Sequence, residues 1–180
     1  MLYEFEGLIP KISEKAYVHP SAVVIGNVEL KDHVYIAPGA VLRGDYGTIT
    51  IDENTAIEDN CVVHARPKEA THIGKYVTVG HGSVIHTATV KDFAVIGMRA
   101  VITDYAVVGI WAVVAEGAVV KKGQIVPDEK IVVGVPAEIK GVVSEEYKKQ
   151  WLDFKNIYVS FTERYKKNLK RIDGGIDNGI

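Results

Sequence analysis

The sequence predicts an all-β fold: a parallel β-helix built from six-residue repeats, with one α-helix at its C-terminal end. Small residues recur at every sixth position in the second half of the chain, at Ala94, Ala100, Ala106, Ala112 and Ala118. Aliphatic residues keep the same spacing two positions later, from Ile96 to Val120. Helices repeat every 3.6 residues and strands every 2, so neither element alone produces this period. A period of six is typical of a β-helix in which each repeat forms one short strand and one turn.

The same spacing covers the N-terminal half of the chain, where the aliphatic positions are Val18, Val24, Leu30, Ile36 and Leu42. Two segments break the register, residues 44–50 and residues 65–71, and their glycine, proline and polar residues predict loops. Three repeats per coil would give a triangular prism whose coils stack about 4.8 Å apart. We therefore expect the β-helix domain to occupy residues 1–143. The spacing does not decide the hand of the coil, and right-handed crossovers are the general rule.

An amphipathic helix is predicted over residues 144–171. Ser144 is a suitable N-cap, and Glu145 and Glu146 in the first turn complement the helix dipole. Apolar residues then follow at steps of three and four, at Tyr147, Trp151, Phe154, Tyr158, Phe161, Tyr165 and Leu169. This stripe predicts that the helix packs along the prism. Residues 172–180 are rich in glycine and polar residues, and we expect a flexible tail.

The composition is that of an ordinary globular protein, with 47% hydrophobic residues and a formal net charge of −2. The chain has no basic excess for nucleic acid and no apolar run long enough to cross a membrane. Acidic residues near the start disfavour a signal peptide, and the single cysteine, Cys61, excludes an internal disulfide. We expect a cytoplasmic protein with Cys61 in its core.

Three of the six histidines form a pattern on the predicted prism. His64 follows Val63 and His86 follows Ile85, and these aliphatic positions are one coil apart once the insertion at 65–71 is skipped. The two imidazoles should therefore stack about 4.8 Å apart, close enough to bind one metal ion. His81 lies on a different face, but in a threefold trimer it could meet the pair of a neighbour. The alternative is that these are ordinary hydrogen-bonded surface histidines.

Several segments resemble the γ-class carbonic anhydrase family. They are Arg43-Gly44-Asp45, Glu58-Asp59-Asn60 leading to His64, and VGHGSVIH with His81 and His86. Residues 96–101, residues 133–137 and the VSEE-led helix are similar to one branch, which contains the phenylacetate-degradation and carnitine-operon accessory proteins.

The resemblance implies a left-handed β-helix and a homotrimer, with zinc as the metal and iron or cobalt as alternatives. His64, His81 and His86 would be the ligands, shared across each subunit interface. It also implies that Arg43 and Asp45 lie at this interface, with Asp59 as the interchain partner of an arginine.

The activity implied by the resemblance is the reversible hydration of CO2 to bicarbonate by a metal-bound hydroxide. Glu58 would orient the attacking oxygen, and Tyr158 of the helix is a second catalytic candidate, with aromatic packing as its alternative role. The sequence departs from the family at two positions that carry proton-handling glutamates. Tyr46 stands at the first position and residues 65–67 at the second.

Three other functions stay open for this sequence. The same metal site could hydrolyse an ester or an acyl-CoA thioester, for which a groove wide enough for the acyl-CoA would be needed. A hexapeptide acyltransferase would use one histidine as a general base and would need no metal. Zinc could also serve only to hold a non-catalytic trimer together.

Overall fold

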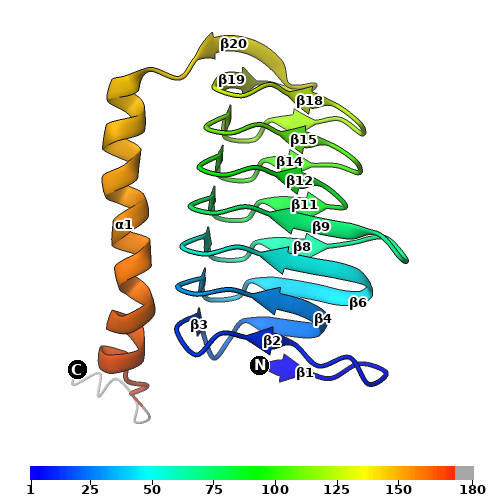
Figure 1. Cartoon of the computed structure of the whole chain (residues 1–180), viewed down its shortest axis with the longest axis vertical. Coiled ribbons are helices and arrows are strands. Elements are labelled where there is room, and N and C mark those ends of the chain that lie inside the picture. The colour runs from blue at the N-terminus through cyan, green and yellow to red at the C-terminus, as the bar shows by residue number, and fades with distance from the viewer. Residues whose placement is uncertain (173–180) are drawn as a thin grey trace, which may run out of the picture.

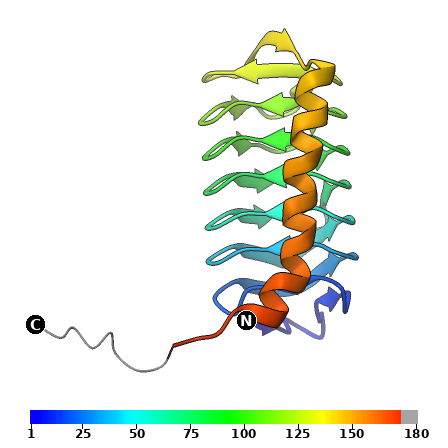
Figure 2. The same cartoon turned by 90° about the vertical axis from the view of Figure 1, so that its left-hand side faces the viewer.

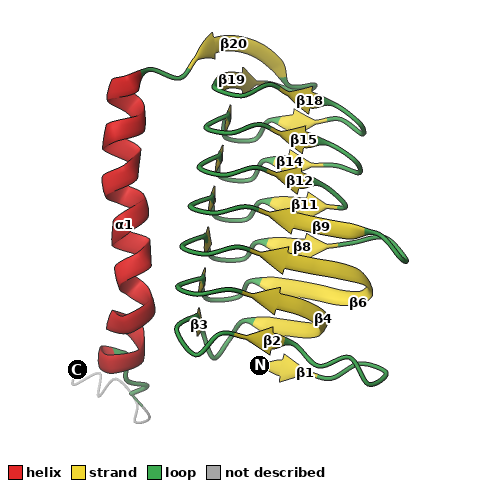
Figure 3. Ribbon diagram, viewed as in Figure 1, coloured by secondary structure: helices red, strands yellow, loops and turns green. Residues whose placement is uncertain are grey.

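A computed structural model describes residues 1–172 as a left-handed β-helix of about seven turns with one helix beside it (Figure 1). The fold class predicted from the six-residue period is therefore confirmed. Figure 3 shows the stacked strands and the single helix. The predicted tail at 172–180 lies outside the described residues except for Ile172. Among the described residues, no helix is both long and apolar enough to span a membrane.

The coils form three faces, and strands of successive coils pair in parallel on each. The face that carries His64 and His86, called the histidine face, contains the N-terminal halves of β4 (Val23–Leu30) and β6 (Val41–Ile51), followed by β8 (Val62–His64), β11 (Val84–His86), β14 (Val101–Ile102) and β17 (Val119–Val120).

The second face, called the helix face, lies under the C-terminal helix. It contains β3 (Tyr17–Val18), β5 (Tyr35–Ile36), β7 (Ala56–Ile57), β10 (Thr78–Val79), β13 (Val95–Ile96), β16 (Val113–Val114) and β19 (Lys130–Val133). β20 (Glu138–Val142) pairs antiparallel with β19 and closes this end of the prism.

The third face contains β2 (Lys11–Ile12), the C-terminal halves of β4 and β6, β9 (Ala70–Ile73), β12 (Thr89–Val90), β15 (Val107–Val108) and β18 (Ile125–Val126). β1 (Leu2–Tyr3) pairs with β4 at the N-terminal end.

The loop predicted over residues 44–50 is not formed. β6 continues through this segment as one strand, because it follows β4 round the corner between the histidine face and the third face. The pairing register shifts between Gly26 and Val28 to accommodate the bend. Gly44 permits it, since a Cβ there would lie 2.5 Å from the carbonyl oxygen of Asn27. The second break is confirmed as a loop, which begins after β8 and ends at β9.

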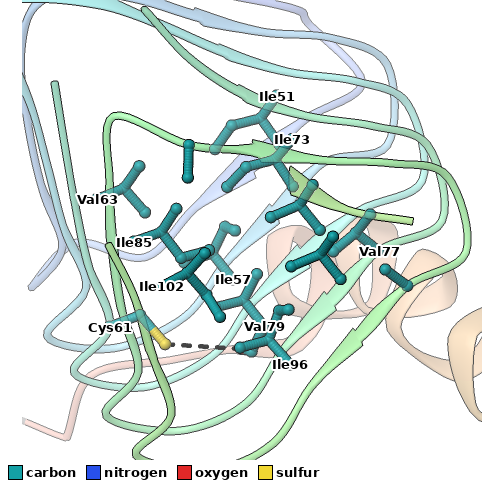
Figure 4. Close-up of a cluster of buried hydrophobic side chains, with 14 of the residues drawn as sticks. Ile51, Ile57, Cys61, Val63, Ile73, Val77, Val79, Ile85, Ile96 and Ile102 are labelled. Atoms are coloured by element: carbon teal, nitrogen blue, oxygen red, sulfur yellow. Dashed lines mark hydrogen bonds between the residues drawn. The ribbon is translucent and has the colours of Figure 1, made fainter. Parts of the chain in front are cut away.

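The interior is filled by columns of aliphatic side chains, to which successive coils add their members in register. Figure 4 shows part of this core, in which Ile57, Val79 and Ile96 are stacked in register along the helix face. All three are fully buried, as the spacing predicts. Cys61 lies in the same core, with Sγ 3.1 Å from the carbonyl oxygen of Gly80, and burial raises its pKa to about 12.

α1 (Glu145–Asn168) runs along the helix face over most of the height of the prism (Figure 2). Ser144 caps it as predicted, accepting a hydrogen bond from the Tyr147 backbone amide at 3.1 Å. The helix ends three residues before the predicted position 171, because the backbone becomes extended at Leu169.

The predicted contact stripe of α1 is partly wrong. Phe154 and Leu169 are 47% and 48% exposed, whereas Lys155 and Thr162 are 1% and 0% exposed. Lys155 and Thr162 are seven residues apart, which puts them on the same side of a helix. The buried side of α1 therefore includes two polar residues, because the Lys155 amine finds acceptors in Thr78 Oγ1 and the Ala94 carbonyl oxygen.

Candidate metal centre

His64 and His86 stack on the histidine face, one coil apart. β8 and β11 pair with His64 opposite His86, and the two ring centroids are 5.1 Å apart. Nδ1 of His64 lies 3.1 Å from Nε2 of His86. The stacking predicted by counting repeats is therefore present in the structure, with one nitrogen of each ring facing the other.

Asp45 holds the outer nitrogen of His64. Its Oδ1 lies 3.0 Å from Nε2 of His64, and its Oδ2 accepts a 2.6 Å hydrogen bond from Arg43 Nη1. Burial raises the pKa of Asp45, but the hydrogen bonds from Arg43 and His64 outweigh it and hold the pKa below its usual value. Burial also lowers the pKa of His64, and the Arg43 charge adds to this effect. His64 is therefore neutral near pH 7, as a metal ligand must be.

Asp104 holds the outer nitrogen of His86 in the same way. Its Oδ1 lies 2.5 Å from Nδ1 of His86, and its Oδ2 accepts a 2.8 Å hydrogen bond from Arg66 Nη1. Asp104 and Arg66 are site residues that the histidine pattern did not predict. A signal for Asp104 was present, because it follows Ile102 by two residues and Ile102 pairs with Ile85 one coil below.

Each of the two carboxylates faces the outer nitrogen of one imidazole. A carboxylate only accepts, so when Nε2 of His64 and Nδ1 of His86 carry the protons, each ring donates one hydrogen bond to its carboxylate. The facing nitrogens, Nδ1 of His64 and Nε2 of His86, then each present a lone pair to the other at 3.1 Å. Two lone pairs repel unless a proton or a metal cation lies between them. Two nitrogens on one tetrahedral zinc would be about 3.3 Å apart, so the pair fits a metal ion.

His81 lies apart from this pair, in the turn between β10 and β11. Its Nδ1 lies 2.7 Å from Asp59 Oδ2, its Nε2 lies 3.0 Å from Glu58 Oε2, and the ring is 50% exposed. Within one copy of residues 1–172, no three His, Cys, Asp or Glu side chains are arranged to hold a metal. That His81 joins the pair of a neighbouring chain stays a prediction, and so does the pairing of Asp59 with an arginine of another chain.

Glu58 and Tyr158 lie near His81, where the chain turns from the helix face to the histidine face, and away from the histidine pair. Glu58 is 6% exposed, and its Oε2 also accepts from the His81 backbone amide at 3.1 Å. Burial raises the pKa of Tyr158, and a hydrogen bond to Glu58 raises it further. The Tyr158 ring also packs against Tyr35, with centroids 6.0 Å apart. Tyr158 thus combines the predicted aromatic packing with a contact to the candidate catalytic carboxylate.

A column of valines runs beside the histidines on the outside of the histidine face. The members pair in register and leave part of each side chain exposed, 39% in the case of Val62. They are Val23, Val41, Val62, Val84, Val101 and Val119. A continuous apolar stripe of this kind is typical of a surface that another protein chain covers.

A groove of about 430 Å³ lies between α1 and the helix face. Tyr147 and Trp151 form its helix wall, and its strand wall is mainly aliphatic. Glu58 and His81 lie among its lining residues. An apolar groove with a few polar groups at one place is the usual form of a small-molecule site.

The chain is similar to known proteins over most of its length. Residues 9–44 match the family model of the bacterial transferase hexapeptide (six repeats). The carnitine operon protein CaiE of Citrobacter koseri is 42% identical over 144 residues, which cover 80% of this chain and 73% of that protein. CaiE of Escherichia coli O157:H7 is 40% identical over 144 residues, which cover 80% of this chain and 74% of that protein.

Two solved structures share the fold closely. A hexapeptide transferase family protein from Anaplasma phagocytophilum has a TM-score of 0.87 and 32% identity, covering 91% of this chain and 97% of that one. A Bacillus cereus protein provisionally named an acetyltransferase has a TM-score of 0.90 and 27% identity, with coverages of 93% and 98%. The chain belongs to the hexapeptide-repeat family, in the γ-class carbonic anhydrase-like branch that contains CaiE.

Proposed function

We propose that three copies of the chain bind one metal ion at each subunit interface and that this centre catalyses the reversible hydration of CO2. His64 and His86 of one chain and His81 of the next would hold the ion. The observation that carries the proposal is the pair of facing imidazole nitrogens, 3.1 Å apart, with their outer nitrogens held by Asp45 and Asp104. Carboxylates behind ligating histidines are a usual feature of zinc sites.

Zinc bound there would act as a Lewis acid and lower the pKa of a coordinated water to about 7. The chain's own residues would orient that water. Glu58 Oε2 lies 3.0 Å from His81 Nε2 and can accept a hydrogen bond from a water beside this nitrogen. The hydrogen bond between Tyr158 and Glu58 keeps the carboxylate in place. Asp59 Oδ2, 2.7 Å from Nδ1, would hold the His81 ring when Nε2 binds the metal.

The valine column supports a partner chain on the histidine face. It flanks the histidine pair along the height of the prism, so a copy that covered it would bring its own surface next to the metal ligands. Hexapeptide-repeat proteins are typically trimers. A closed threefold ring uses the same two surfaces at each of its interfaces. The second surface would contribute His81, which lies in the turn between β10 and β11.

The test combines metal content with CO2 hydration measured by stopped flow. We expect one zinc or iron per chain and metal-dependent hydration in the wild type, and loss of both in His81→Ala. His72→Ala is the matched control, because His72 pairs with Asp52 on the third face. Retention of one metal per chain in His81→Ala would contradict the shared site.

Co-expression of two inactive variants tests the sharing directly. His64→Ala chains keep His81, and His81→Ala chains keep the pair, so mixed trimers contain some complete interfaces. Random assembly should restore about one quarter of the wild-type sites, because each site needs one chain of each kind in a fixed order. If mixed trimers form but no metal is recovered, the site does not span two chains.

The groove favours hydrolysis of an acyl thioester as the second candidate function. Its aliphatic wall suits an acyl chain, and His81 among its lining residues would put the thioester carbonyl near the metal centre. We expect Ala115→Phe, which fills the groove, to lower acyl-CoA hydrolysis without changing metal content. Unchanged hydrolysis in this variant would rule out the groove. Activity that needs an added acyl acceptor and survives metal removal would instead indicate an acyltransferase, as the names of the structural relatives suggest.

A further inference from the structure

Asp104 occupies a position from which it can control the orientation of His86. It lies in the turn after β14, one coil beyond β11, and its side chain reaches back to the His86 ring. Its Oδ1 is 2.5 Å from Nδ1 of His86, so the charged carboxylate can accept a hydrogen bond from this nitrogen. A second acceptor is nearby only at a longer distance, since Thr87 Oγ1 is 3.5 Å from the same nitrogen.

Arg66 fixes the other oxygen of Asp104. Its Nη1 donates to Asp104 Oδ2 at 2.8 Å, so the carboxylate is held from both sides. Arg66 comes from the loop between β8 and β9, where the six-residue register is interrupted. The Arg66 backbone amide donates to Thr87 Oγ1 at 2.8 Å, which ties the start of this loop to the residue that follows His86. The loop therefore carries the guanidinium to Asp104.

The position of the proton on His86 determines whether Nε2, the nitrogen that faces His64, presents a lone pair or a hydrogen. With Nδ1 protonated and bound to Asp104, the lone pair of Nε2 points at His64 Nδ1, 3.1 Å away. With Nε2 protonated, a hydrogen would occupy that space and the ring could not bind a metal there. A free histidine samples both forms, so an acceptor at Nδ1 is needed to select one.

We propose that Asp104, held by Arg66, is a positioning residue that fixes the Nδ1-protonated form of His86 and directs Nε2 toward the space shared with His64. Its consequence for metal affinity rests on the proposed metal centre, whereas its effect on the His86 ring does not. Asp45 does the corresponding task for His64 from the opposite end of the pair.

The first experiment examines the His86 ring without any metal. In metal-free protein labelled with ¹⁵N-histidine, at pH 8, we expect the nitrogen spectrum to show His86 protonated on Nδ1. Asp104→Asn should shift His86 toward the Nε2-protonated form, because the amide can donate to Nδ1. Asp52→Asn is the matched control, since Asp52 forms a 2.7 Å pair with His72 on the third face. A wild-type His86 protonated on Nε2, or an unchanged spectrum in Asp104→Asn, would overturn the proposal.

The second experiment measures the affinity for Zn²⁺ by competition with a chromophoric chelator, and the absorption spectrum of the Co²⁺ form. We expect Asp104→Asn to bind about 10- to 100-fold more weakly, Arg66→Ala to be weakened less, and Arg66→Lys to recover part of that loss. Asp52→Asn should bind as the wild type does. Wild-type affinity and an unchanged Co²⁺ spectrum in Asp104→Asn would refute the positioning role. If the wild type binds no metal but the His86 protonation behaves as expected, the proposed function fails and the positioning of the ring stands.

Discussion

Lys155 is an unusual residue for the interior of a protein, and from its burial we predict how the free energy of unfolding depends on pH. Its side chain is 1% exposed, and Nζ donates to Thr78 Oγ1 at 3.2 Å and to the Ala94 carbonyl oxygen at 3.3 Å. The rings of Trp111 and Trp151 lie 5.9 and 5.8 Å from Nζ. Burial lowers the pKa of Lys155 from 10.5 to about 7, although the Glu58 charge opposes this.

The sign and size of the effect follow from the two pKa values. Below pH 7 both the folded and the unfolded chain carry the proton, and folding includes the full cost of burying the charge. Between pH 7 and pH 10.5 only the unfolded chain binds the proton, so stability rises with pH. The difference between 10.5 and about 7 corresponds to about 5 kcal/mol at 1.36 kcal/mol for each pH unit. Between pH 7 and pH 9 the gain should be about 2 kcal/mol.

Lys155→Met removes the titrating group and keeps most of the side-chain volume. We expect the free energy of unfolding of the wild type, measured in urea, to rise by about 2 kcal/mol relative to this variant between pH 7 and pH 9. The protein concentration must be constant, because assembly contributes to the stability of an oligomer. Lys167→Met, at an exposed position of the same helix, should keep the wild-type pH dependence. Parallel pH profiles for the wild type and Lys155→Met would refute the reasoning.

Three further substitutions test the packing of the fold. Gly97→Ala should destabilise the protein by about 3 kcal/mol in thermal unfolding, because the new Cβ would lie 2.5 Å from the Glu116 backbone nitrogen. Ile85→Ala should cost about 2–5 kcal/mol by the cavity it leaves in the core, and a smaller loss would mean that the coils can close around it. Ser144→Ala should cost about 1 kcal/mol of stability. It should also speed hydrogen exchange of the Tyr147 amide, because this amide donates a hydrogen bond to the serine hydroxyl.

The six-residue period predicted the fold well because each repeat has one inward aliphatic position, and inward positions of successive coils must stack. The pairing of Val63 with Ile85, and of Ile85 with Ile102, follows from this spacing alone. The hand of the coil does not, because either hand gives the same pairing. That prediction depended on resemblance.

The buried side of α1 was less predictable for a physical reason. A pattern of apolar residues identifies the apolar side of a helix. Lys155 is buried nevertheless, because its amine lies near two tryptophan rings and reaches two oxygen acceptors. Those acceptors belong to β10 and to the residue before β13, at positions far from α1 in the sequence. Only the three-dimensional fold brings them together.

The candidate site was likewise predictable only in part. The stacking of His64 and His86 follows from regular repeats, whereas two of their partners come from the segments that interrupt the register. Asp45 lies in the long bent strand β6, and Arg66 lies in the loop before β9. A regular prism places outward side chains in straight columns, with each residue above its equivalent in the coil below. Such a column stacks the two imidazoles, and the regular turn after β14 adds Asp104 at the His86 end. It offers no carboxylate at the His64 end and no arginine beside Asp104. The interruptions provide these groups because they let the chain leave the column and return to it. Irregular coils in related chains are therefore the places where we expect the residues that control the histidines.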